Sequence, residues 1–376
     1  MIRQTKAGTW TFTIEEGVDL DGKRVRRWFG GYPTKKAAKA SEAEELARRG
    51  RGESVERNKV TLAKYLNDEW FPAIRGEVAE TTLETYAYLM RSYVIPTLGR
   101  RPLQDIRPAE ISRLYSDLLE NGRTQGEGGL SQTSVRNVGV VLGRALERGV
   151  DWGYLIANPA KKAKKPSPEA KEMRIWAPAT VKEFLELERD TREHLVWRLA
   201  FYSGARRGEI LGLSWDAVDF DAGRLTIHQS LVNVENQPTL RKTTKTKSGK
   251  RLIHLDDETV SILREHRRHQ NEERLLAGPL WDNEHKLVFV DELGRMLRPE
   301  AITKRFKARV KSHGLDPIRF HDCRHTAASN MLRAGINVKV VSERLGHDVR
   351  VLLSTYAHTI PSQDEEVAAI VAEMYG

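Results

Sequence analysis

Two polar segments interrupt the apolar pattern of this chain and limit what it can fold into. Residues 48–57 are rich in Arg, Gly and Glu, and residues 161–178 open with a run of lysines and prolines. Neither segment can bury enough apolar surface to order itself, so we expect linkers. The 376 residues are then predicted to form three domains, namely residues 1–57 (with the first linker), 58–160 and 179–376.

The first domain has the pattern of a small β-rich module. Apolar residues alternate with threonines at Trp10, Phe12 and Ile14. Asp21-Gly22 is a turn dipeptide, and residues 24–29 then form a return strand on which Arg24 and Arg26 share one face. The hydroxyl of Thr34 is suited to cap a following helix. A small antiparallel sheet followed by one helix is the expected architecture.

The second domain is predicted to be entirely helical. Thr81 to Glu84 has the capping-box pattern, Pro108 fits a first helical turn, and Ser131 fits a helix start. Apolar residues at helical spacing follow each of these signals. Such stripes form cores far more often than cofactor sites, and we interpret them as core.

The third domain mixes helices and strands. A second capping-box pattern at Thr180 opens helical segments that run to about Leu213. Residues 224–227, 231–234 and 251–255 have the character of short antiparallel strands, and helices resume from Pro299. The fold class is therefore multidomain and mainly α, with α+β parts and a mixed α/β third domain.

The amino-acid composition indicates which class of partner the chain binds. There are 62 Lys+Arg against 52 Asp+Glu, and the net charge of +10 favours a polyanion. The basic residues Arg24, Arg26, Lys161, Lys162, Lys164 and Lys165 fit either a DNA-facing surface or a solvated one. A single cysteine excludes an internal disulfide framework. No signal peptide or membrane-spanning stretch is evident, so we expect a soluble cytoplasmic protein.

Two arginines can bind one phosphodiester. A guanidinium meets two phosphate oxygens in paired hydrogen bonds, and charge on those oxygens grows as a nucleophile enters. Arg206, in the segment Gly204 to Glu209, and Arg324, in His321 to His325, are the candidates. Each would stabilise the transition state more than the ground state.

Tyr356 is the candidate nucleophile. A phenol has a pKa near 10, so it needs positive charge or a base nearby. His321 and His347 can accept a proton or donate an oriented hydrogen bond. A leaving alkoxide needs a proton, and a lysine on a hairpin is a suitable acid; the candidates are Lys242, Lys245, Lys247 and Lys250.

Other chemistries lack support in the sequence. There is no G-x-x-x-x-G-K-[ST] loop for ATP, and no cofactor is expected. His321 and His325 have i,i+4 spacing, but Cys323 would point away from their shared helix face, so no metal site is expected.

These motifs resemble those of the tyrosine recombinase, or phage integrase, family. Gly204 to Glu209 is similar to the family's first arginine box, His321 to His325 to its H-x-x-R-H box, and Leu345-Gly346-His347 to its L-G-H box. Thr355 to His358 is similar to its nucleophile segment. Residues 244–251 resemble the hairpin that bears the family's lysine, with Lys245 favoured and Lys247 an alternative.

The resemblance implies a site-specific recombinase that integrates and excises a phage or other mobile element. Tyr356 would form a 3′-phosphotyrosine link and release a 5′-hydroxyl, which the lysine protonates. It also implies an arm-site module (1–57) with a three-stranded sheet and one helix, a core-site domain (58–160), a basic linker (161–178) and a catalytic domain (179–376). The C-terminal helix of that domain fits either exchange with a neighbouring copy or packing on its own domain. The resemblance implies double-stranded DNA as the partner, bound by a homo-tetramer, with an excision factor and a DNA-bending host protein as candidate helpers. It places the reaction in the bacterial cytoplasm or nucleoid.

Two other functions fit parts of the same pattern. A type IB topoisomerase uses a similar active site to relax DNA, and a DNA-binding regulator could keep the fold without catalysis. The apparent arm module favours a recombinase over a topoisomerase. The complete set Arg206, Lys245, His321, Arg324, His347 and Tyr356 argues against a mere binder.

Overall fold

The computed structural model divides the chain into two compact units, residues 1–169 and 170–376, each described here by itself. The residues that the structure describes are 2–18, 24–50, 58–124, 126–168, 173–242, 250–357 and 371–375. Within them, no helix is long and apolar enough to cross a membrane.

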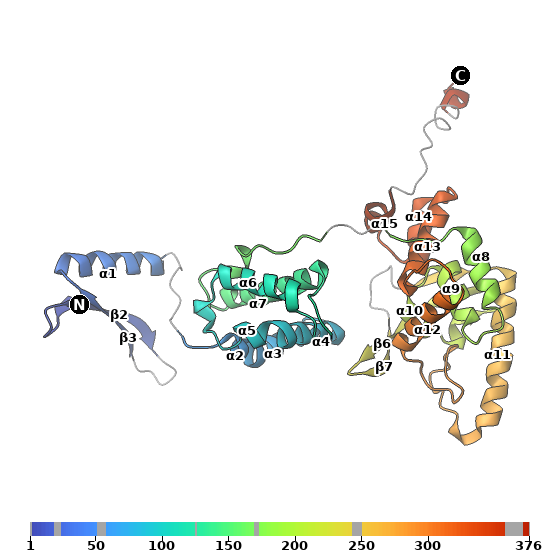
Figure 1. Ribbon diagram of the computed structural model, residues 1–376, viewed down its shortest axis with the longest axis horizontal. Coiled ribbons are helices and arrows are strands. Elements are labelled where there is room, and N and C mark those ends of the chain that lie inside the picture. Colours follow the sequence, from blue (N-terminus) through green and yellow to red (C-terminus); the bar gives the residue numbers. More distant parts are fainter. Residues whose placement is uncertain are drawn as a thin grey trace. The chain divides into compact units, whose positions relative to one another are not determined.

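The chain begins with a three-stranded antiparallel sheet covered by one helix (Figure 1). Its elements are β1 (Ile2–Gln4), β2 (Trp10–Val18), β3 (Arg24–Tyr32) and α1 (Lys35–Gly50). Phe12 is fully buried and stacks on Phe29 with ring centroids 4.8 Å apart. The Thr34 hydroxyl accepts a 3.1 Å hydrogen bond from the Ala37 amide, so this predicted cap is confirmed. The predicted Asp21-Gly22 turn lies outside the described residues.

The rest of the first unit is helical. Its elements are α2 (Leu62–Lys64), η1 (Tyr65–Trp70), α3 (Phe71–Ile74), α4 (Glu80–Leu89), η2 (Met90–Val94), α5 (Ile95–Leu98), η3 (Leu103–Asp105), α6 (Pro108–Asn121), α7 (Gln132–Asp151) and η4 (Pro159–Lys161). The segments η1 and η2 are π-helical, and each leads directly into a turn that contains Pro72 or Pro96. Proline removes an amide donor and crowds the preceding turn, and the wider π geometry accommodates it without ending the helix.

Helix starts in this unit show which capping signals were correct. Ser131 caps α7, its hydroxyl accepting from the Ser134 amide at 3.1 Å, and Pro108 opens α6, both as predicted. The capping box at Thr81 is wrong, because α4 starts at Glu80 with Ala79 as its extended N-cap. In the second unit the box at Thr180 is wrong as well, since Pro178 already begins the helix.

The strands of the second unit form two separate sheets. One contains β4 (Val218–Asp219), β5 (Arg224–Ile227) and β8 (Arg251–His254), and the other pairs β6 (Gln229–Val234) with β7 (Gln237–Lys242). All three predicted strands exist, but 231–234 does not join the other two. Its partner β7 was missed; the two-residue turn between them, Glu235 and Asn236, has positive φ at both positions.

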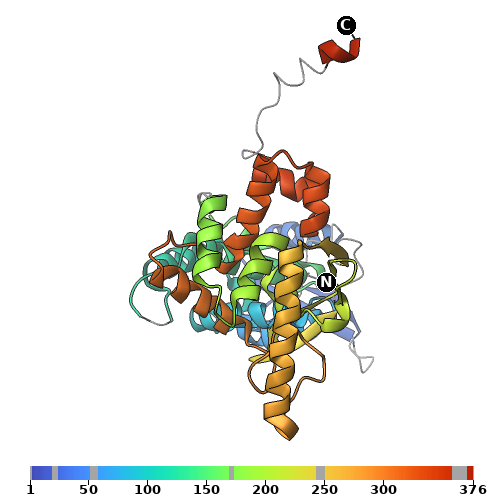
Figure 2. The same ribbon diagram turned by 90° about the vertical axis from the view of Figure 1, so that its right-hand side faces the viewer.

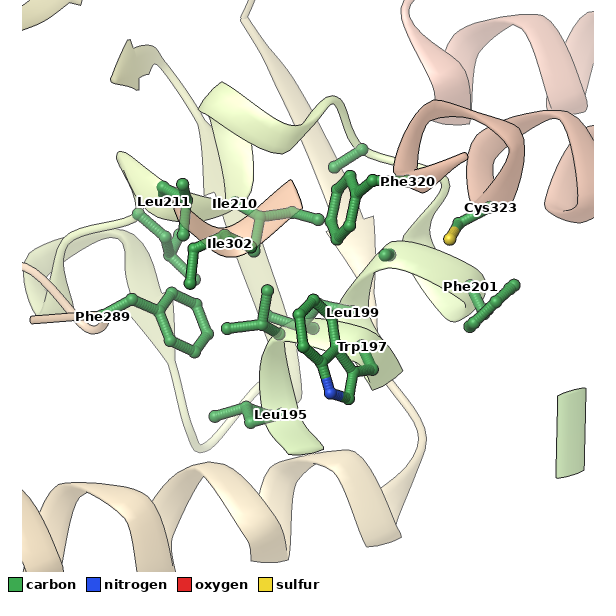
Figure 3. Packing of buried hydrophobic residues seen from close by; sticks show 14 of the residues in the cluster. Leu195, Trp197, Leu199, Phe201, Ile210, Leu211, Phe289, Ile302, Phe320 and Cys323 are labelled. Atoms are coloured by element: carbon green, nitrogen blue, oxygen red, sulfur yellow. The ribbon is translucent and has the colours of Figure 1, made fainter. Parts of the chain in front are cut away.

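Helices form most of the second unit. They are α8 (Pro178–Leu187), α9 (His194–Ser203), α10 (Arg207–Leu211), η5 (Trp215–Ala217), α11 (Asp257–Ala277), η6 (Gly278–Leu280), α12 (Pro299–Ser312), α13 (Phe320–Arg333), α14 (Val338–Leu345) and α15 (Val349–Tyr356). The core is built around α9, whose Trp197 is fully buried among aromatic and aliphatic side chains of α10, α12 and α13 (Figure 3). Cys323 points into this core and is 1% exposed.

Helix α11 was not predicted, because helices were expected to resume only at Pro299. It spans 21 residues and lies on the outside of the unit, at its right-hand side in Figure 1 and facing the viewer in Figure 2. Its buried positions are Thr259, Val260, Leu263 and Gln270. Two of these four are polar, so the sequence carries no continuous apolar stripe.

The predicted basic linker, 161–178, is anchored at both ends. Ala163 is buried in the helical core of the first unit, and Trp176 is buried in the core of the second. The Trp176 indole nitrogen donates to the Asp316 carbonyl at 2.9 Å. The domain boundaries proposed from the sequence remain predictions.

The corrected helix starts can be tested with matched substitutions. Ser131→Ala removes a cap worth about 1 kcal/mol, so amides in the first turn of α7 should exchange about fivefold faster. Thr81→Ala lies inside α4 and should leave exchange there unchanged or slower, because alanine favours helix. Hydrogen exchange measured by mass spectrometry on both variants checks this. If Thr81→Ala speeds exchange in α4 more than Ser131→Ala speeds it in α7, then Thr81 does cap its helix.

Candidate active site

Arg324 brings three distant segments of the chain together. It lies on α13, is 1% exposed, and donates from Nη1 to the Gly204 carbonyl at 2.7 Å and from Nη2 to the Leu345 carbonyl at 2.6 Å. These carbonyls immediately precede Ala205-Arg206 and Gly346-His347. Its Nε is buried and has no hydrogen-bond partner among the described residues. Burial lowers the pKa of Arg324 to about 9, and the charge of Arg206 adds to this.

Gly204 makes this close approach possible. It ends α9 in the left-handed region, with φ of 62°. A Cβ at this position would stand 2.3 Å from Cδ2 of Leu345. Any larger residue would therefore push apart the two carbonyls that bind Arg324.

Arg206 occupies the N-cap of α10 and is held by Glu209. The Arg206 amide donates to Glu209 Oε2 and its Nη1 donates to Oε1, both at 2.8 Å. The Arg206 side chain is 46% exposed, whereas that of Glu209 is 4% exposed. One face of the Arg206 guanidinium is thus fixed while the rest remains open to a ligand.

Arg251 of β8 completes the support of Glu209. Its Nη1 and Nη2 donate to the two Glu209 oxygens at 3.1 and 2.7 Å, and its Nε donates to the Arg344 carbonyl at 2.8 Å. Burial by itself raises the pKa of the Glu209 carboxyl, but the hydrogen bonds and charge of Arg251, with help from Arg206, bring it down to about 2. Glu209 is therefore ionised and links α10 to β8, and Arg251 extends this link to the end of α14.

Three imidazoles stand beside these arginines. His321 and His325 lie one turn apart on α13, with ring centroids 5.0 Å apart and planes at 88°. Burial lowers the pKa of His347 to about 4, with Arg324 and Arg206 adding to the effect. Burial also lowers the pKa of His321, reinforced by His325 and Arg324. Neutral rings result at pH 7, able to donate hydrogen bonds to an anion without adding charge.

Tyr356 ends α15 and is fully buried. Its hydroxyl lies 2.5 Å from Nδ1 of His325. Burial raises the pKa of Tyr356 to about 12, although the Arg324 charge acts in the opposite direction. The phenol is thus protonated in this state and within electrostatic reach of Arg324.

The structure brings five of the six predicted catalytic residues together: Arg206, His321, His347 and Tyr356 surround Arg324. The sixth, Lys245, and its alternative Lys247 lie outside the described residues. Lys242 ends β7, Lys250 precedes β8, and both are exposed.

Three residues at this site were not assigned from the sequence: Glu209, Arg251 and His325. Glu209 stands three positions after Arg206, the spacing at which a carboxylate can satisfy an N-cap amide. That spacing could have identified it. His325 was noted only as part of a box, and nothing in the sequence signals its contact with Tyr356.

The predicted DNA-contact residues lie in the first unit and are exposed where described. Arg26 pairs with Glu15 across β2 and β3 at 3.1 Å, and Lys161 pairs with Glu147 at 2.7 Å. Lys162, Lys164 and Lys165 are exposed. The Arg24 side chain lies outside the described part of the chain.

Comparison with known proteins decides the family. Residues 178–363 match the phage integrase family, residues 61–119 match the N-terminal SAM-like domain of phage integrases, and residues 1–47 match an arm DNA-binding domain. The chain belongs to the tyrosine recombinases of the phage integrase family. It is a site-specific recombinase, an enzyme that cleaves and rejoins DNA strands. The family resemblance and the enzyme class predicted from the sequence are confirmed.

Individual recombinases match nearly the whole chain. A XerC-like tyrosine recombinase of Caldanaerobacter subterraneus subsp. tengcongensis is 29% identical, covering 96% of this chain and 95% of the relative. The ICEBs1 integrase of Bacillus subtilis is 24% identical over 98% of both chains.

Solved recombinase structures share the fold. The Tn1549 transposon integrase, in complex with a circular intermediate DNA, has a TM-score of 0.68 at 18% identity, covering 84% of this chain and 99% of that one. A lambda integrase dimer bound to a core site has a TM-score of 0.57 at 18% identity, covering 94% and 93%. The predicted fold class is confirmed.

The Glu209 carboxylate makes stability depend on pH in a defined direction. Its pKa is lowered in the folded protein, so its contribution is present above its ordinary value and is lost as pH falls from about 4.5 toward 2. Glu209→Gln should destabilise the second unit on the order of 3 kcal/mol at pH 7. The difference in unfolding free energy between wild type and Glu209→Gln should become smaller as the pH falls from 5 to 3.

Urea titrations with pulse-labelled hydrogen exchange in peptides covering α10 and β8 measure this gap. Glu186→Gln is the matched control, because that carboxylate is 65% exposed and pairs with Arg189 at the surface of α8. The control should change stability by less than about 0.5 kcal/mol at either pH. An equal gap for Glu209→Gln at pH 7 and pH 3 would show that its charge is not what stabilises the site.

Proposed function

We propose that this recombinase integrates and excises a mobile element by forming a 3′-phosphotyrosine link through Tyr356. The observation that carries the proposal is the buried Arg324, which holds the segments of Arg206 and His347 around one point near Tyr356. Relatives named as integrases of ICEBs1 and of Salmonella phage P22 support a mobile-element role.

The scissile phosphate binds between Arg206 and Arg324. Arg206 presents an exposed guanidinium whose far side is fixed by Glu209, and Arg324 retains an Nε with no partner among the described residues. Preorganised donors of this kind stabilise charge that develops in the transition state, because they need no reorganisation when it forms. The neutral rings of His321 and His347 add hydrogen bonds to the same oxygens.

Strand cleavage is an in-line displacement at phosphorus. The Tyr356 oxygen forms a bond to phosphorus while the bond to the 5′ oxygen breaks, and the phenolic proton leaves to a base. The hairpin lysine, Lys245 or its alternative Lys247, supplies a proton to the departing 5′ oxygen. Attack by a 5′-hydroxyl of a partner strand reverses these transfers and rejoins the DNA, so no nucleotide cofactor is needed.

The remaining parts of the chain bind and assemble on DNA. Residues 1–57 contact arm sites, 58–160 contact core sites, and the basic linker 161–178 follows the phosphate backbone into the catalytic domain, 179–376. A lambda integrase tetramer has been solved on a Holliday junction, which supports a homo-tetramer here. Within that tetramer the C-terminal helix would pack on a neighbouring copy. Reactions of this kind take place on DNA in the bacterial cytoplasm, with an excision factor and a DNA-bending protein as candidate helpers.

Tyr356→Phe tests the proposal directly. The variant keeps the aromatic ring in its buried site, so DNA binding should stay within about twofold of wild type. Covalent protein–DNA adduct should fall below detection, because phenylalanine has no oxygen to attack phosphorus. Adducts are trapped with the full-length protein on nicked duplexes, chosen from a random pool by retention on wild type, and measured on denaturing gels.

Tyr375→Phe, an exposed tyrosine near the C-terminus, is the matched control and should form adduct as wild type does. Adduct from Tyr356→Phe would identify another nucleophile. A two-site strand-exchange assay then distinguishes activities: relaxation of supercoils without exchange would point to a topoisomerase, and binding without either would point to a regulator.

A further inference from the structure

The contact between His325 and Tyr356 gives the nucleophile a base that the sequence motifs did not assign. The phenolic oxygen lies 2.5 Å from Nδ1 of His325, and the two ring centroids are 5.6 Å apart. Tyr356 is fully buried and His325 is partly buried, so water does not compete freely for this hydrogen bond. The residues come from α13 and α15, and Tyr356 follows His325 by 31 positions.

The surroundings of His325 favour its neutral form. Burial lowers the pKa of this imidazole, Asp322 acts in the opposite direction, and Arg319 and Arg324 lower the pKa further. His321 from the same helix and His347 from the end of α14 also face this region, and both have lowered pKa values. A neutral ring with Nδ1 unprotonated can accept the phenolic hydrogen.

The other two histidines are placed differently. His321 lies in the first turn of α13, and its ring meets that of His325 edge to face. Nδ1 of His347 is buried and lacks a hydrogen-bond partner among the described residues, with both arginines lowering the pKa of the ring. These positions suit hydrogen bonding to the phosphate, whereas His325 is already at the nucleophile.

We propose that His325 is a further catalytic residue, the general base that takes the proton of Tyr356 in strand cleavage. As the Tyr356 oxygen bonds to phosphorus, its proton moves to Nδ1 of His325, and the bond from phosphorus to the 5′ oxygen breaks. The 5′ oxygen receives a proton from the lysine. In rejoining, the lysine recovers that proton and the imidazolium of His325 returns its own to the leaving phenolate. The inference rests on the proposed attack by Tyr356.

His325→Asn tests the proton transfer, since an amide at the position of Nδ1 can keep a hydrogen bond but cannot take a proton at neutral pH. Single-turnover adduct formation should slow at least about 100-fold at pH 7, within the usual range for general base catalysis. The probe is the selected duplex, with a sulfur atom replacing the bridging 5′ oxygen at the phosphate mapped from the wild-type adduct. A thiolate leaves without protonation, so this probe removes only the need for an acid.

The sulfur duplex distinguishes loss of the general base from loss of the general acid. Lysine→Ala at whichever of Lys245 and Lys247 is the acid should regain nearly the wild-type rate on the sulfur duplex, and His325→Asn should not. The wild-type rate on this duplex should be flat with pH above the lowered pKa of His325. The His325→Asn rate should rise tenfold per pH unit between 7 and 9, because hydroxide then removes the proton.

If the asparagine distorts the site, His325→Ala with added imidazole provides a second test. Recovery of adduct formation on addition of imidazole supports His325 as the general base. His269→Asn on α11, 60% exposed, is the control and should match wild type. Three results would overturn the role of His325. The His325→Asn variant could cleave within threefold of the wild-type rate, it could regain the wild-type rate on the sulfur duplex, or its rate could be lower but independent of pH. Absence of adduct from wild type overturns the attack by Tyr356 itself, and with it this role.

Discussion

The hydrogen bonds from Arg324 to the carbonyls of Gly204 and Leu345 are the constraint on which the rest of the site depends. A buried guanidinium without acceptors is strongly unfavourable, so the fold must supply oxygens where Arg324 lies. It does so with the ends of two helices, α9 and α14, both of which terminate at a left-handed glycine, Gly204 or Gly346. Helix ends have carbonyls with no partner in their own helix, and these two satisfy both needs at once. The residues that follow each end, Arg206 and His347, are thereby fixed relative to Arg324.

A concentration of positive charge then has to be offset without blocking the phosphate. The buried Glu209 carboxylate provides the compensating charge. It accepts hydrogen bonds from Arg206 and Arg251 and stabilises both guanidiniums, while the exposed face of Arg206 stays open to the phosphate. Burial, assisted by the same cationic surroundings, explains why the histidines are neutral. Positive charge and burial both disfavour an imidazolium, as the lowered pKa values of His321, His325 and His347 show. Phosphate binding and the availability of a neutral base are thus two consequences of one buried, positively charged site.

Signals in the sequence succeeded where one local interaction decides the structure and failed where several compete. Ser131 caps α7 because its hydroxyl accepts a hydrogen bond from the Ser134 amide, only three positions along the chain. At Thr81 and Thr180 a threonine stands three positions before a glutamate, but those helices already begin at Glu80 and Pro178. Strand β7 was missed because it contains Pro238 and its turn has no glycine. Helix α11 was missed because two of its four buried residues, Thr259 and Gln270, are polar and satisfied by hydrogen bonds that only the folded chain supplies.

The candidate site shows the same division. Residue type and spacing were enough to single out Arg206, Arg324, His347 and Tyr356, because arginines, a histidine and a tyrosine in separate motifs have few shared uses other than phosphoryl transfer. What they could not show is which ring meets the phenol. His321 and His325 differ by one helical turn, and either could face Tyr356 depending on the angle at which α15 packs. That angle is set by the apolar cluster of Leu332, Val341, Leu345 and Leu352 around the tyrosine, so the identity of the base is decided by packing and not by the motif.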